Sequence, residues 1–142
     1  VENNHLWNTF TLELQHRWKS LSDLRKRISA VEGTFEPGKN FDLVVDVARI
    51  LHTIKSAAMV VPVEVVTRAT HALESLIEAG SNRNEWPSQA FSRYCDWLEM
   101  FFSPVDQTWS SWSETGQYLA ADLEQQLDSP QGAEQQAASC QA

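Results

Sequence analysis

The chain has 142 residues, of which 42% are hydrophobic and 21% charged, a balance typical of one globular domain rather than of a disordered segment. Its formal net charge of −8 argues against a general nucleic-acid-binding protein and against a polybasic membrane anchor. No apolar run approaches the roughly 20 residues that span a bilayer. The two cysteines, Cys95 and Cys140, are far apart in the sequence, which is typical of a reduced compartment. We therefore expect a cytoplasmic protein that binds neither nucleic acid nor membrane.

The first two helices are predicted from apolar residues that recur every three or four positions. One covers residues 6–31, has Arg17 as its polar break and ends before Gly33 and Pro37. Asn40 is placed to cap the second helix. The inward-facing positions of this second helix are Val44, Val47, Ala48, Leu51, Ile54 and Ala58.

Three further helices are predicted after a break at Pro62, which suits the first turn of the third helix. The fourth helix begins near Pro87, and residues 103–106 give a start signal for the fifth. The fifth helix has one apolar stripe, formed by Val105, Trp109, Trp112, Leu119, Leu123 and Leu127. No segment shows sustained two-residue alternation, so no strand is expected.

These elements predict an all-α fold, an antiparallel four-helix bundle with an additional fifth C-terminal helix. We expect the bundle to occupy residues 1–127. Residues 128–142 are rich in Ser, Gln, Gly and Ala and are predicted to be a flexible tail or linker.

The charges are divided unevenly along the chain. All eleven Lys and Arg residues lie between Arg17 and Arg93, whereas residues 94–142 contain eight acids and no Lys or Arg. If Val61 and Pro62 form the centre of a helical hairpin, residues equally distant from that centre lie level: His52 with His71, Arg49 with Glu74, and Lys55 with Arg68. We therefore expect a basic group near His52, and the acidic residues elsewhere.

The hairpin places an imidazole beside a cation and a carboxylate. His52 is on the flank of the apolar face, one turn from Lys55, and Ser56 is a small residue at position i+4. Glu74 can accept a proton from one ring nitrogen and leave the other as a nucleophile. This set suits phosphoryl transfer to histidine, which requires positioning and charge neutralisation more than covalent machinery.

Two segments also resemble a known family. Residues 51–55, Leu-His-Thr-Ile-Lys, resemble the phospho-accepting motif of histidine phosphotransfer (HPt) domains, most closely the N-terminal phosphotransfer domain of CheA-type chemotaxis kinases. Residues 71–74, His-Ala-Leu-Glu, resemble the His-x-Leu-Glu signature of that subfamily on the following helix. The resemblance implies that His52 is phosphorylated, that Lys55 assists at the phosphoryl group, and that His71 and Glu74 orient and tune the imidazole.

The same resemblance implies the partners, which are a histidine kinase catalytic domain and a response-regulator receiver domain. The sequence contains no glycine-rich ATP lid, Walker-type loop or acidic receiver pocket, so we expect a phosphotransfer intermediate rather than a kinase. We expect no cofactor, and we expect a monomer when the domain is isolated.

Two alternatives stay open at this point. Ser56 and Pro62 stand where the family usually has glycines, which favours a transfer-inactive adaptor that docks signalling partners. His52, His71 and Glu74 also supply three possible metal ligands. However, the sequence lacks the paired Glu-x-x-His motifs of di-iron bundles, and Lys55 would repel a cation, so no metal is expected.

Overall fold

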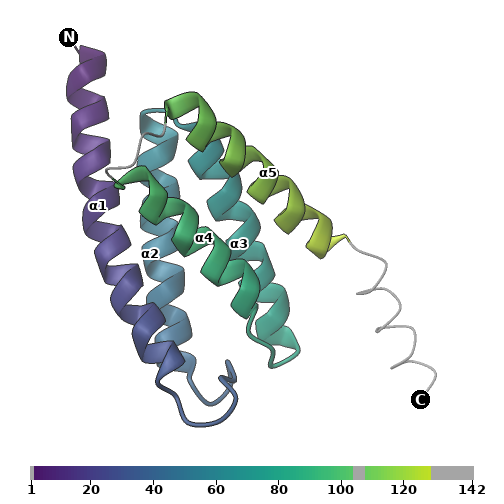
Figure 1. The fold of residues 1–142 in the computed structure, drawn as a ribbon. Coiled ribbons are helices and arrows are strands. Elements are labelled where there is room, and N and C mark those ends of the chain that lie inside the picture. The colour runs from purple at the N-terminus through teal and green to yellow at the C-terminus, as the bar shows by residue number, and fades with distance from the viewer. Residues whose placement is uncertain (1, 104–107, 129–142) are drawn as a thin grey trace.

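The computed structural model describes residues 2–103 and 108–128, which form helices joined by short connections and contain no strand (Figure 1). The helices are α1 (Glu2–Ser29), α2 (Phe41–Val60), α3 (Glu64–Asn82), α4 (Ser88–Phe101) and α5 (Trp109–Leu127). The predicted all-α fold is confirmed. The predicted tail lies, from residue 129 onward, outside the described residues, so it stays a prediction.

Helices α1 to α4 run alternately up and down as an antiparallel bundle, and α5 descends across α3 and α4 (Figure 1). Helix α1 packs on α2 and α4, and α3 packs on α2, α4 and α5. The predicted four-helix bundle with a fifth helix is therefore confirmed. Within the described segments, no helix combines the length and apolarity needed to cross a membrane.

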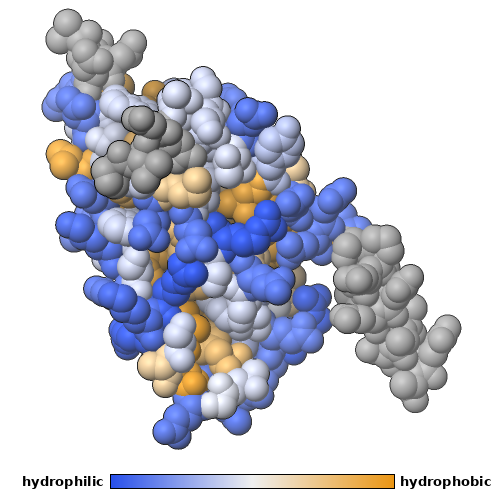
Figure 2. Space-filling view, viewed as in Figure 1, coloured by the Kyte–Doolittle hydropathy of each residue, from blue (hydrophilic) through white to orange (hydrophobic). Residues whose placement is uncertain are grey.

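The core is built mostly from the predicted helical stripes, whereas the predicted inward positions Ala48, Trp109 and Leu127 are exposed. In α2 the fully or nearly fully buried side chains are Val44, Val47, Leu51, Ile54 and Ala58, which recur every three or four residues. Because these stripes turn inward, most of the face seen in Figure 2 is hydrophilic, with apolar side chains visible between the polar ones. The α2 stripe also decides which side of the helix remains available to a partner.

Two tryptophans attach α5 to α4. The Trp97 Nε1–H donates to the Trp112 carbonyl at 3.0 Å, and the Trp112 Nε1–H donates to the Trp97 carbonyl at 2.7 Å. Their rings stack with centroids 4.3 Å apart. Gly116 lets the helix approach closely, because a Cβ atom there would collide with Trp97 and Val65. Helix α5 is therefore a packed part of the domain.

Several predicted helix ends differ from the structure. Helix α1 ends at Ser29, two residues earlier than expected. Pro62 lies in the turn before α3 rather than in its first turn, because the Val63 N–H donates back to the Ala58 carbonyl and α3 begins only at Glu64. The Asn40 side chain does not cap α2, since its Nδ2 donates to the Glu36 carbonyl at 3.1 Å.

The predicted start of α5 at residues 103–106 includes residues 104–106, which are outside the described part of the chain. The described helix begins at Trp109, where the Thr108 hydroxyl accepts a hydrogen bond from the Ser111 N–H at 3.1 Å. Thr108 thus satisfies one of the free backbone donors of the first turn.

Candidate functional site

The four predicted site residues flank the apolar faces of α2 and α3. His52 is exposed because its neighbours Leu51 and Ile54 are turned into the core. His71 is exposed in the same way beside the buried Ala72 and Leu73 of α3. An exposed imidazole on a rigid helix is accessible to a second protein.

Lys55 and Glu74 form an ion pair that connects α2 to α3. The Lys55 Nζ atom lies 2.7 Å from Glu74 Oε1, and both side chains are 21% exposed. Glu74 Oε1 is buried and accepts no hydrogen bond from any described residue, although it lies against the Lys55 ammonium. The Lys55 ammonium therefore balances the carboxylate charge mainly by proximity.

The ion pairs do not follow the predicted level positions, which placed Arg49 opposite Glu74 and Lys55 opposite Arg68. Glu74 contacts Lys55, and Arg68 forms an ion pair with Glu124 of α5. The reason is electrostatic: two cations repel, and long side chains reach along the helices to opposite charges instead of to level positions.

The described residues provide neither imidazole with a hydrogen-bond partner. The structure thus brings Lys55 and Glu74 together but does not place His52 or His71 in hydrogen-bonding contact with them. His71 instead lines a shallow pocket of about 360 Å³ at the tip of the hairpin, with Met59, Pro62, Glu64, Thr67 and Arg68.

The charge distribution predicts that the acidic residues lie away from the site, but the acidic helix α5 lies close to it. A hydrogen bond from the Arg68 guanidinium holds the pKa of Glu124 below its usual range, and the charge of His71 acts in the same direction. Two further ion pairs, Arg25 with Asp96 and Arg93 with Asp122, also join basic residues to acids of the last third. The expectation that the acid lies away from the site is therefore wrong for Glu124.

A buried pair of hydroxyl groups behind the site was not predicted. Thr70 Oγ1 and the Tyr94 hydroxyl are 2.7 Å apart, and both residues are fully buried. Burial, together with the nearby Glu74 charge, raises the pKa of Tyr94 above its usual range. A threonine between the apolar positions Ala69 and Leu73 of α3 is the sequence signal that could have indicated this pair.

The comparison with protein families decides the identity of the fold. A family model described as the Hpt domain matches residues 5–128. The chain belongs to the Hpt domain family. No curated protein and no solved structure gives a significant match. The predicted family is thereby confirmed, whereas the closer likeness to CheA-type kinases stays a prediction.

Hpt domains are phosphotransfer modules of two-component signalling that interact with its kinases and receivers and contain no ATP-binding catalytic domain. This Hpt domain therefore has a phosphotransfer role. Within residues 2–103 and 108–128, no three His, Cys, Asp or Glu side chains gather as a metal site would require.

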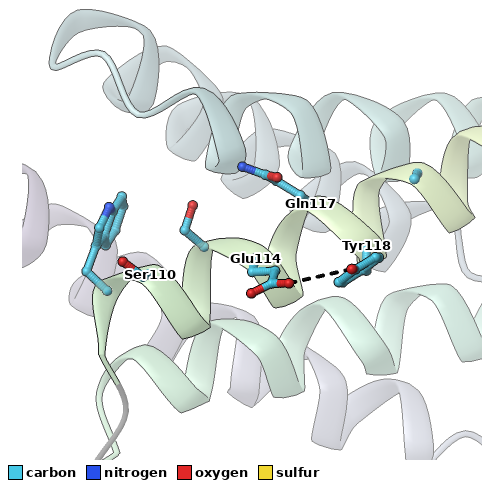
Figure 3. Close-up of a pocket in the computed structure, with 7 residues that line it drawn as sticks. Ser110, Glu114, Gln117 and Tyr118 are labelled. Carbon is cyan, nitrogen blue, oxygen red and sulfur yellow. Dashed lines mark hydrogen bonds between the residues drawn. The ribbon is translucent and has the colours of Figure 1, made fainter.

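A second pocket of this Hpt domain, of about 580 Å³, runs along the outer face of α5 (Figure 3). Trp109 and Tyr118 are two of the residues that line it, and the Tyr118 hydroxyl contacts Glu114 at 3.5 Å. None of the four predicted site residues lines this pocket, so it is separate from the hairpin site.

Proposed function

We propose that His52 accepts a phosphoryl group from ATP held by a kinase domain, or from a receiver aspartyl phosphate, and passes it to a response-regulator receiver. The observation that carries the proposal is the exposed His52 imidazole, one turn from a lysine that is held by Glu74 at 2.7 Å. The motif at residues 51–55 and the Hpt family membership support the same assignment.

The reaction is a displacement at phosphorus. The unprotonated ring nitrogen of His52 forms the N–P bond while the P–O bond to the leaving oxygen breaks. The electron pair leaves with the ADP or with the receiver carboxylate, and the other ring nitrogen keeps its proton. Transfer to the next receiver reverses these steps with an aspartate oxygen as the nucleophile.

Lys55 supplies positive charge at this step. Its ammonium has three donors on a flexible stem and needs only a change of side-chain torsion to turn from Glu74 toward a group on His52. Charge that is already held near the reacting atoms stabilises the transferring phosphoryl group without a large reorganisation. Lys55 is thus the proposed phosphoryl-binding residue.

Glu74 and His71 belong to the same proposed site as positioning residues. Glu74 acts through the ion pair that keeps Lys55 on the α2–α3 face. His71 acts from the exposed flank of α3, where it borders the pocket that an incoming partner would meet. This arrangement revises the expected role of Glu74, because the group that it contacts is the lysine.

Labelling with radioactive phosphate tests the proposal. The protein is incubated with a phosphorylated receiver, or with a partner kinase and ATP, and acid-labile, alkali-stable phosphate is measured. We expect label on the wild type and on His16→Gln, a control that changes an exposed histidine of α1, and none on His52→Gln.

Two results would contradict the assignment. If His52→Gln takes up as much label as the wild type, another residue is the acceptor. If the wild type binds several receivers and kinases but stays unlabelled with all of them, the adaptor function is correct instead.

A further inference from the structure

The buried hydroxyl pair lies one helical turn from Glu74. Thr70 and Glu74 are at positions i and i+4 of α3 and so share one side of that helix. Tyr94 reaches Thr70 from α4, with the two oxygens 2.7 Å apart. Both hydroxyl residues have no exposed surface, so water does not satisfy them.

The pair contains one more donor than it uses. Each hydroxyl carries one proton, and either oxygen can be the donor of their single hydrogen bond. Whichever group donates, the other O–H proton has no acceptor among the described residues. A buried donor without an acceptor is unfavourable, and such groups are rare in folded proteins.

Glu74, in turn, has an acceptor atom that lacks a hydrogen-bond donor. Its Oε1 atom is buried and accepts no hydrogen bond from the part of the chain that the structure describes, and its charge is balanced by Lys55. Its carboxylate is near enough to Tyr94 to affect the titration of the phenol. An unused hydroxyl donor at Thr70 or Tyr94 is thus present one helical turn along α3 from a residue whose buried oxygen accepts no hydrogen bond.

We propose that Thr70 and Tyr94 are positioning residues that stabilise the Glu74 carboxylate when Lys55 turns from it to the phosphoryl group on His52. This inference rests on the proposed phosphotransfer function. A phosphoryl group brings close to two negative charges, which compete with Glu74 for the single ammonium. The unused O–H then turns to Glu74 Oε1, so the carboxylate does not stay buried without a partner.

The exchange involves hydrogen bonds and torsion angles only. The Lys55 ammonium can leave Glu74 because the unused hydroxyl then donates a hydrogen bond to the carboxylate. The ion pair of the resting state therefore does not prevent Lys55 from reaching the phosphoryl group. Without the hydroxyls, moving Lys55 leaves a buried carboxylate uncompensated, and phosphorylated His52 becomes harder to form. The hydroxyl pair therefore affects the transfer step although it touches neither His52 nor the phosphate.

The first test is kinetic. Tyr94→Phe and Thr70→Val remove one hydroxyl each with little change of shape, and Tyr118→Phe is the matched control on the exposed face of α5. We expect phosphoryl transfer to His52 to slow about tenfold in both buried variants and to be unchanged in the control, because a hydrogen bond to a charged group is lost. Thr70→Ser, which keeps the hydroxyl, should restore the wild-type rate.

A double variant separates this role from a merely structural one. If the hydroxyls act through Glu74, then Tyr94→Phe should not slow transfer further in a Glu74→Gln background. Additive losses would overturn the proposal. Wild-type transfer rates in both folded hydroxyl variants would overturn it as well, but would not affect the proposed function of His52. If the wild type does not take phosphate on His52, both the role of the hydroxyls and the proposed phosphotransfer function are wrong.

A spectroscopic test needs no substitution in the buried pair. Tyrosine labelled with ¹³C at Cζ is observed by NMR before and after phosphorylation of the histidines with phosphoramidate. We expect the Tyr94 resonance to shift in the wild type but not in His52→Gln, while the Tyr118 resonance stays in place in both. A Tyr94 resonance that does not respond to phosphorylation of His52 would overturn the proposal.

Discussion

Removing the lysine of the hairpin ion pair should cost more stability than removing its acid. Lys55→Met leaves the buried Oε1 of Glu74 without a positive charge, and a hydroxyl group that turns to this atom supplies a hydrogen bond but no charge. Glu74→Gln leaves an ammonium instead, and a lysine stem is long enough to take its charge to water. The two variants remove the same contact, yet the groups that they leave behind differ.

The magnitude follows from the distance and the exposure. Unit charges 2.7 Å apart attract by about 1.5 kcal/mol in water and about 6 kcal/mol at an effective dielectric constant of about 20. Desolvation of both groups offsets most of this attraction. For side chains that are 21% exposed, we expect Lys55→Met to cost about 1–3 kcal/mol, between the values for exposed and buried pairs, and Glu74→Gln to cost less than about 1 kcal/mol.

Urea unfolding followed by the fluorescence of the six tryptophans measures both changes. Arg68→Met is the control: it breaks another interhelical ion pair, but one that is 46% and 42% exposed, so we expect less than about 0.5 kcal/mol. The double variant Lys55→Met/Glu74→Gln should be more stable than Lys55→Met. Equal losses in the two single variants, or additive losses in the double variant, would refute the reasoning.

Two further predictions concern the packing of the fourth and fifth helices. Gly116→Ala should destabilise the domain by about 1–3 kcal/mol, because the added Cβ collides with Trp97 and Val65, and an unchanged urea midpoint would contradict this. Burial raises the pKa of the Cys95 thiol to about 12, so the folded state favours the neutral thiol. The contribution of this preference to folding stability is present below the unfolded pKa of about 9 and is lost as the pH rises toward 12. In a Cys140→Ser background, iodoacetamide should therefore react slowly at pH 8 until urea unfolds the chain, and rapid reaction of the native protein would be inconsistent with the buried thiol.

The positions of the individual site residues were predictable to different degrees. Exposure of His52 follows from local geometry, because its place in the helical repeat is set by Leu51 and Ile54 on the inward stripe. The partner of Glu74 was not predictable in this way. Counting residues from the turn assigned it to Arg49, whereas the attraction between opposite charges and the reach of the side chains joined it to Lys55.

The sequence by itself determined most of the helical stripes, the all-α bundle and the family, because these depend on residue spacing along one helix or on a short segment such as the motif at residues 51–55. Only the tertiary structure decided that Arg68 pairs with Glu124 and that Thr70 meets Tyr94, since each contact joins two different helices and depends on how these pack together. Packing at residues such as Gly116 and Trp97 sets the rotation and crossing of α5 and α4, and no spacing rule within a single helix specifies these.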